Sequence, residues 1–149
     1  MAEGAAQAPP LPGYVPADPD DPFEMRAGPF FRDPDGSGGS RLALRIEERH
    51  CNSGGVAHGG LLMTMMDLCL AQTARNDPAI DYVFTVSMTS EFADAGRCGD
   101  LAEARGEVVR HGRSLAFVRG QIHAGDRILL NASAVFKLRW RPDIAAGQG

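Results

Sequence analysis

Residues 58–74 read HGGLLMTMMDLCLAQTA, and this stretch determines what kind of domain the chain can form. It predicts a helix that begins near His58 and ends just before Pro78, because proline cannot continue a helix. Asp67 is the only charged side chain within it. A helix that is apolar on nearly all sides is buried on nearly all sides. We therefore expect this helix at the centre of the domain, with one curved sheet wrapped around it.

Segments on both sides of this helix alternate apolar and polar residues, a pattern typical of strands with one buried and one solvated face. On residues 82–92 one face is expected to carry the large apolar side chains Tyr82, Phe84, Val86, Met88 and Phe92. Turn-like stretches at 111–113 and 124–126 predict hairpins, so the last three strands should form an antiparallel meander. The expected fold class is α+β, with strands at about residues 41–47, 82–92, 101–110, 115–123 and 128–138.

The composition is that of one globular domain, with 149 residues, 44% of them hydrophobic, and a formal net charge of −4. The acidic balance argues against nucleic-acid binding, which usually requires a basic surface. No apolar run approaches the roughly 18 residues needed to span a membrane, so no membrane partner is expected. The N-terminus lacks the features of a secretory signal and three scattered cysteines suit free thiols, so we expect a cytoplasmic protein.

The two ends of the chain differ in composition from its middle. Residues 1–22 are rich in Ala, Pro, Gly and Asp and offer little apolar surface, which predicts a disordered or loosely draped tail. We expect the folded domain to span residues 23–140 and residues 141–149 to form a flexible C-terminus.

Asp67 is the most informative single residue, because burying an unpaired charge is costly. One interpretation is structural: the carboxylate hydrogen-bonds a backbone amide or a neighbouring arginine, or reaches an edge of the domain. The other is a functional carboxylate that is tuned by its surroundings.

A glycine-rich run, residues 52–60, directly precedes the helix. The first N–H groups of a helix have no internal partner and lie at the positive end of its dipole, so such a start can stabilise an oxyanion. A plain glycine-rich loop is the structural alternative. The run lacks the G-x-G-x-x-G and Gly-Lys-Ser/Thr patterns of nucleotide-binding loops.

Other common catalytic patterns are missing from the sequence. The spacing of His50, Cys51 and His58 fits no zinc pattern, so no metal site is expected. Cys51 and Cys69 lie among apolar residues, which do not favour a reactive thiolate. No G-x-S-x-G motif of a serine hydrolase is present.

Residues 49–60, RHCNSGGVAHGG, together with Asp67 resemble the active-site signature of hotdog-fold acyl-CoA thioesterases. The closest branch is the phenylacetic-acid-degradation (PaaI-like) type of the 4-hydroxybenzoyl-CoA thioesterase superfamily. Its pattern is an Asn, then seven residues to the Gly of His-Gly-Gly, then eight to an Asp, and Asn52, Gly59 and Asp67 reproduce both spacings. The resemblance covers roughly residues 28–139 and implies a hotdog fold, a five- or six-stranded antiparallel sheet wrapped around one long central helix.

The resemblance also implies roles for these residues. The Gly59 N–H would bind the thioester carbonyl oxygen, Asp67 would be the general base for water or the nucleophile, and Asn52 would position the water or the carboxylate. Around them, His58 and Gly60 would contact ligand near the oxyanion site, and Thr85 would be the small hydroxyl residue near the thioester.

The resemblance further implies that residues 92–97 and 110–115 lie where relatives hold coenzyme A. Coenzyme A is part of the substrate, so no separate cofactor is expected. The two segments contain the candidate binding residues Arg97, His111, Gly112, Arg113 and Ser114. Arg97 and Arg113 could pair with the phosphates by bidentate hydrogen bonds, or could be solvated turn arginines.

Helix geometry indicates that the catalytic site is shared between two chains. Asp67 lies eight residues beyond Gly59, and so about 12 Å along the same helix. A carbonyl held at one helix start is therefore out of reach of the carboxylate in the same chain. A two-fold homodimer with antiparallel central helices, alone or within a homotetramer, would bring the two groups together.

The sequence therefore predicts an acyl-CoA thioesterase that hydrolyses an acyl- or aryl-acyl-CoA to the free acid and coenzyme A. Two alternatives stay open. A hotdog dehydratase or hydratase is disfavoured because no glutamate lies on the central helix. A non-catalytic acyl-CoA-binding module would not need the complete set of Asn52, Gly59 and Asp67.

Overall fold

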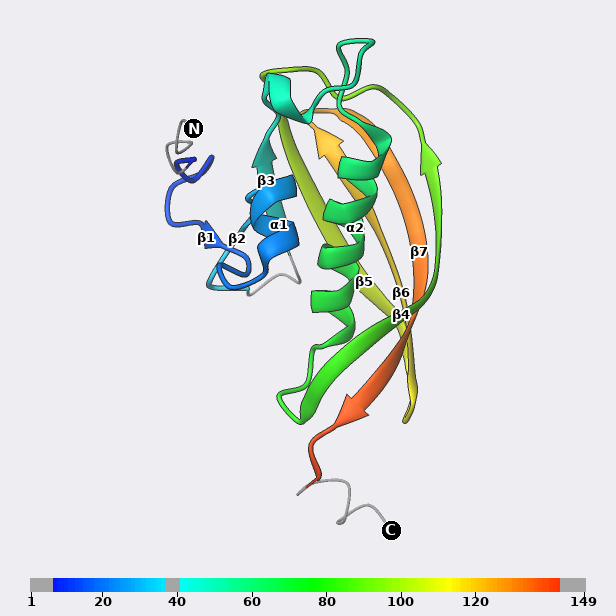
Figure 1. Ribbon diagram of the computed structural model, residues 1–149. Coiled ribbons are helices and arrows are strands. Elements are labelled where there is room, and N and C mark those ends of the chain that lie inside the picture. The colour runs from blue at the N-terminus through cyan, green and yellow to red at the C-terminus, as the bar shows by residue number, and fades with distance from the viewer. Residues whose placement is uncertain (1–6, 37–40, 143–149) are drawn as a thin grey trace.

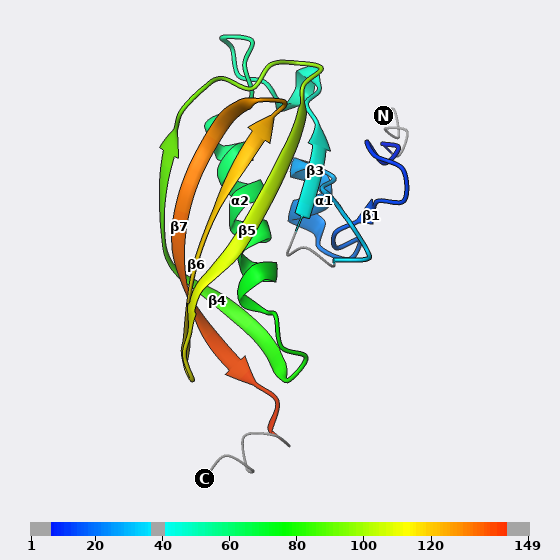
Figure 2. The same ribbon diagram turned by 180° about the vertical axis from the view of Figure 1, so that it is seen from behind.

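One helix packed against one antiparallel sheet makes up most of the molecule (Figure 1). The computed structural model describes residues 7–36 and 41–142. Within these residues the sheet has seven strands in the order β1-β2-β3-β5-β6-β7-β4, and Figure 2 shows it in front of the central helix α2. The strands are β1 (Val15–Pro16), β2 (Phe31–Arg32), β3 (Arg41–Arg45), β4 (Ile80–Phe92), β5 (Leu101–His111), β6 (Leu115–Ala124) and β7 (Arg127–Trp140); the helices are α1 (Pro22–Ala27), the 3₁₀ turn η1 (Glu48–His50) and α2 (Gly59–Ala74).

The expected central helix and meander are confirmed. His58 is the N-cap of α2 and Arg75 its C-cap. Strands β5, β6 and β7 are consecutive antiparallel neighbours. The burial of α2 is less complete than the sequence predicts, because the sheet covers only one side of the helix. Met63 is 40% exposed and Asp67 is half-buried on the side that faces away from the sheet.

Two paired glycines allow α2 to lie close against the sheet. Gly106 on β5 and Gly120 on β6 are register partners beneath the helix. A Cβ at Gly106 would lie 2.3 Å from the Thr73 hydroxyl oxygen, and one at Gly120 would lie 2.7 Å from Cε of Met66. A side chain at Gly106 would therefore push the helix away from the sheet, and one at Gly120 would also clash with the Arg105 carbonyl oxygen of β5, 2.4 Å away.

The alternation expected along β4 is wrong beyond its midpoint. A bulge interrupts its register with β7 between Thr85 and Ser87, so that Val86 has no partner. An extra residue in one strand reverses which side chains face inward. Tyr82 and Phe84 share the outer face and are exposed, although their apolar face was expected to be buried. Met88 and Phe92 lie opposite the buried residues Ala134 and Leu130 of β7, on the helix side of the sheet, where Phe92 stays 53% exposed.

The N-terminal segment is more ordered than its composition indicates. Within the predicted tail, residues 7–22 are described: Val15–Pro16 pairs with β2, and α1 begins at Pro22. These two-residue strands raise the count to seven, and they are too short to show any periodicity. Residues 1–6 and 143–149 lie outside the described part, so the flexible C-terminus stays a prediction. No helix in the described residues is long and apolar enough to cross a membrane.

Candidate functional site

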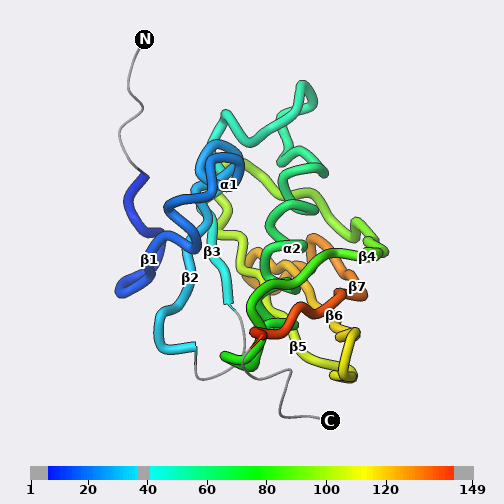
Figure 3. The backbone as a smooth tube through the Cα atoms, turned by 60° about the horizontal axis from the view of Figure 1, so that its bottom comes forward, coloured from blue at the N-terminus to red at the C-terminus, as the bar shows by residue number. Residues whose placement is uncertain are grey.

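A groove of about 600 Å³ runs along the side of α2 that the sheet leaves uncovered. Figures 1 and 3 place α1 on one side of this helix and β4 on the other. The central helix α2 forms the floor of this groove, and it presents its few polar residues on this side. Side chains from all three elements line the groove, including Phe23, Glu24, Met63, Asp67, Thr85 and Met88.

Asp67 and Thr85 meet inside this groove. The Thr85 hydroxyl on β4 donates a hydrogen bond of 2.8 Å to Oδ1 of Asp67 on α2. The bond fixes the orientation of the carboxylate, and it leaves Oδ2 able to face a water molecule. Asp67 thus reaches a cavity and pairs with no arginine or backbone amide among residues 7–36 and 41–142, which favours the functional interpretation of this residue.

The start of α2 presents a backbone donor at the other end of the same helix face. The His58 ring caps the helix by accepting the Gly60 N–H through Nδ1 at 2.9 Å, so the Gly60 donor is already used. Gly59 is the first helical residue, and an N–H at that position has no intrahelical acceptor. A Cβ at Gly59 would lie 3.3 Å from Cε1 of Phe92, which places the ring beside this donor.

Asn52 holds the loop that precedes α2. Its Oδ1 accepts hydrogen bonds from the backbone N–H groups of Gly54 at 2.9 Å and Val56 at 3.4 Å. The loop is further tied by the Asn52 N–H, which donates to the Val56 carbonyl at 2.8 Å. No acceptor in the described part of the chain pairs with the side-chain NH₂ group of Asn52, and its water-positioning role stays a prediction.

The other predicted binding residues lie at opposite ends of the molecule. Arg97 pairs with Val56 beside the start of α2. The turn with Gly112, Arg113 and Ser114 lies at the far end, where the His111 ring contacts the Ala74 carbonyl through Nε2 at 3.2 Å. Because α2 has 16 residues, about 24 Å separates its two ends. One chain therefore does not bring the two predicted coenzyme A segments together.

A pair of side chains just before the glycine-rich loop holds α1 against the groove. His50 is buried, and its Nε2 lies 3.1 Å from the Gly28 carbonyl oxygen at the end of α1. Its Nδ1 accepts the Glu47 N–H at 2.9 Å, so Nε2 carries the proton and donates to Gly28. The Arg49 guanidinium also donates to the Gly28 carbonyl. Burial, aided by the nearby Arg49 charge, lowers the pKa of His50 and keeps the ring neutral.

This arrangement predicts that acid loosens the attachment of α1. A ring with a lowered pKa contributes stability that is present above its unfolded value of about 6.5 and is lost as the pH falls below it. We expect the melting temperature to fall between pH 7 and pH 5, and to fall less in His50→Gln, whose amide can make both hydrogen bonds without titrating. Differential scanning fluorimetry of both proteins measures this. Equal pH dependence in the two would contradict the role of His50.

The match to known proteins covers the two elements α2 and β4 of this groove. The family model of the thioesterase superfamily matches residues 54–130, more than half of the chain. The chain belongs to the thioesterase superfamily. This membership confirms the resemblance seen in the sequence, and with it the hotdog fold and the class of thioester hydrolases.

Individual relatives of this thioesterase agree with that assignment. PA0474 of Pseudomonas aeruginosa, described as a candidate esterase, is 38% identical over 128 residues that cover 85% of this chain and 95% of that protein. Acyl-coenzyme A thioesterase 13 of Homo sapiens is 30% identical over 78 residues, 50% of this chain and 53% of that protein. The PaaI protein of the E. coli phenylacetic acid degradation operon shares the fold with a TM-score of 0.63 at 17% identity, over 67% of this chain and 72% of that one.

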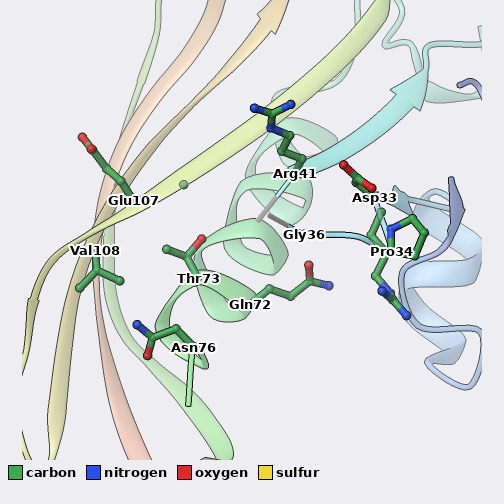
Figure 4. Close-up of a pocket in the computed structure, with 11 residues that line it drawn as sticks. Asp33, Pro34, Gly36, Arg41, Gln72, Thr73, Asn76, Glu107 and Val108 are labelled. Carbon is green, nitrogen blue, oxygen red and sulfur yellow. The ribbon is translucent and has the colours of Figure 1, made fainter. Parts of the chain in front are cut away.

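A second hollow in this thioesterase, of about 530 Å³, contains none of the predicted site residues. Figure 4 shows it between the segment that follows β2, the last turns of α2 and the middle of β5, with Asp33, Gln72, Thr73 and Glu107 around it. Elsewhere, burial raises the pKa of the Cys69 thiol to about 12, so this cysteine is no nucleophile near neutral pH. The described residues contain no group of three or more side chains that could hold a metal ion.

The wall of the thioesterase groove made by α1 was missed in the sequence. Asp21 caps this helix by accepting the N–H groups of Phe23 at 2.9 Å and Glu24 at 2.8 Å. The signal was present, because Asp-Pro-Phe-Glu has an N-cap residue, a proline at the first helical position and a glutamate three residues after the cap. It was obscured by the surrounding Pro and Asp residues, which are typical of a tail.

Proposed function

We propose that this thioesterase hydrolyses acyl-CoA thioesters at the groove along α2. The observation that carries the proposal is the Asp67 carboxylate, which is oriented by Thr85, lines the groove and is the only charged side chain of α2. A carboxylate in such a place can take the proton of an attacking water or attack the carbonyl itself. The human relative, whose name specifies acyl-coenzyme A, supports this choice of thioester.

In this mechanism the start of α2 binds the carbonyl oxygen of the thioester. The Gly59 N–H and the helix dipole stabilise the negative charge that develops on this oxygen when the carbonyl is attacked. Asp67 activates the water, and Asn52 holds that water or the carboxylate in place. His58 contributes by capping the helix, which fixes the direction of the backbone donors.

A second copy of the chain completes the site. The open face of α2 with its exposed Met63, and the unpaired edge of the 13-residue strand β4, leave apolar and hydrogen-bonding surface for a partner. Antiparallel pairing of the two α2 helices would set Gly59 of one chain against Asp67 of the other. The same pairing would bring Arg97 of one chain toward the turn carrying Arg113 of the other, where both could contact the phosphates of coenzyme A.

The test is the release of free thiol from a panel of acyl-CoA substrates that differ in acyl length and in aliphatic or aromatic character. Turnover of at least one member at catalytic rates is the expected result. Hydration or dehydration of an enoyl- or 3-hydroxyacyl-CoA without thiol release would favour the dehydratase alternative. Binding of the panel by calorimetry with no turnover would favour a non-catalytic module.

A further inference from the structure

Glu24 is a second carboxyl group in the groove of Asp67. It belongs to the first turn of α1, and it lines the groove together with Asp67 and Thr85. Its Oε2 atom is fully buried and has no hydrogen-bond partner among the described residues. A buried oxygen without a partner is costly, so such an oxygen in a catalytic groove points to a role with a ligand or a proton.

The surroundings of Glu24 favour its neutral form. Burial is the largest cause, and the negative charges of Asp21, Asp18 and Asp67 add to it, so that the pKa of Glu24 rises to about 7. Tyr82 on β4 and Arg75 at the end of α2 are the other titratable groups that line the adjoining part of the groove. Glu24 therefore holds a proton at a pH at which most carboxyl groups have lost theirs.

The α1 helix that carries this group is built into the fold. Asp21 caps its start, and Arg49 and His50 hold the Gly28 carbonyl at its end. Arg49 and His50 lead into the glycine-rich loop, so one segment positions both the end of the α1 wall and the start of α2. A side chain on such a held element can act at a defined place in the groove.

We propose that Glu24 is the proton donor to the sulfur of the departing thiol, a catalytic role separate from that of Asp67. The inference rests on the proposed function, because it requires a thioester in the groove. Two carboxyl groups in one site with different protonation states are a common way to divide the tasks of acid and base. Here Asp67 accepts a hydrogen bond from Thr85, while Glu24 has an oxygen that no donor among the described residues meets.

Each proton and bond in the proposed step is accounted for. With Asp67 as base, it takes one proton from water as the new carbon–oxygen bond forms, and the carbonyl oxygen becomes an oxyanion. When that intermediate collapses, the carbon–sulfur bond breaks, its electron pair goes to sulfur, and the Glu24 proton goes to the same sulfur. The proton on Asp67 then returns through water to Glu24, and the product acid releases its own proton to solvent. An alkyl thiol has a pKa of about 8.5 or higher, so the transfer from Glu24 to sulfur is favourable.

Leaving groups of different acidity test this role directly. The probes are the acyl-CoA that the panel identifies as a good substrate, and the thioester of the same acyl group with 5-thio-2-nitrobenzoate, whose aryl thiolate needs no proton to leave. Glu24→Gln should lower kcat for the acyl-CoA by roughly 10²-fold, the usual size of general-acid catalysis, and should leave kcat for the aryl thioester within a few-fold of the parent. Glu48→Gln, at an exposed position on η1, is the matched control and should behave as the parent with both substrates.

The unmodified protein supplies a second readout that does not depend on folding of a variant. Its kcat for the acyl-CoA should fall as the pH rises through about 7, where Glu24 loses its proton, and should not fall there for the aryl thioester. Equal kcat in Glu24→Gln and the parent, or an equal loss with both substrates, would overturn the proposal. A parent that releases thiol from neither substrate would instead refute the proposed function, as would full activity in Asp67→Asn.

Discussion

Asp67→Asn is expected to lower acyl-CoA turnover by roughly 10²-fold or more, because the substitution removes the base while keeping the shape of the side chain. The amide oxygen of the variant can still accept the hydrogen bond from Thr85 that the carboxylate accepts at 2.8 Å. Folding should therefore survive, since replacing a half-buried charge by an amide that keeps its hydrogen-bond partner removes little stability. Steady-state thiol release measures the loss, and circular dichroism checks the fold.

The matched control is Asp126→Asn, at the exposed tip of the β6–β7 hairpin. It removes the same charge from the chain outside the groove and should retain parent kinetics. Parent turnover in Asp67→Asn would show that the mechanism is wrong, and the binding-module interpretation would then take first place.

Gly59→Pro removes the proposed oxyanion donor without breaking a helix hydrogen bond. Gly59 is the first residue of α2, where proline is well tolerated because the N–H has no intrahelical acceptor. His58 has φ −61° and ψ 133°, the extended conformation that a residue before proline prefers. We expect kcat to fall about 10²- to 10³-fold, the loss that follows removal of one oxyanion donor.

Gly59→Ala separates the missing N–H from the added carbon. Both substitutions place a Cβ about 3.3 Å from the tip of the Phe92 ring, which must shift slightly, but alanine keeps the donor. The alanine variant should stay within a few-fold of the parent in thiol release. Equal losses in the two variants would mean that the contact with Phe92, and not the N–H, accounts for the effect.

Mixing the two inactive proteins tests whether the site is shared between chains. A heterodimer of Asp67→Asn and Gly59→Pro would contain one site in which Gly59 and Asp67 are both intact. Random exchange of subunits should therefore restore about a quarter of the parent activity, because half of the dimers are mixed and each has one good site of two. No recovery after exchange, with dimers present by light scattering, would place the whole site within one chain.

Much of the fold of this thioesterase could be predicted from local patterns in the sequence. The limits of α2 were predicted from its apolar run and Pro78, and the meander from short turns between alternating segments. Both features depend on residues that are close together in the sequence. The spacing of Asn52, Gly59 and Asp67 indicated the family, which the matching family model confirmed. The faces of β4 could not be read beyond Thr85, because a single bulge reverses them and leaves no mark in the alternation.

By itself, the sequence determined the fold class, the family and the positions of a helix start and a carboxylate about 12 Å apart on one helix. Only the tertiary structure decided what surrounds them. It brought Thr85 from β4 onto Asp67, and it formed the α1 wall that presents Glu24 from residues 22–27, at the boundary between the predicted tail and the predicted domain. The physical reason is that these contacts join residues far apart in the chain. The position of α1, for example, depends on burial and on hydrogen bonds to the Gly28 carbonyl, which no local sequence pattern records.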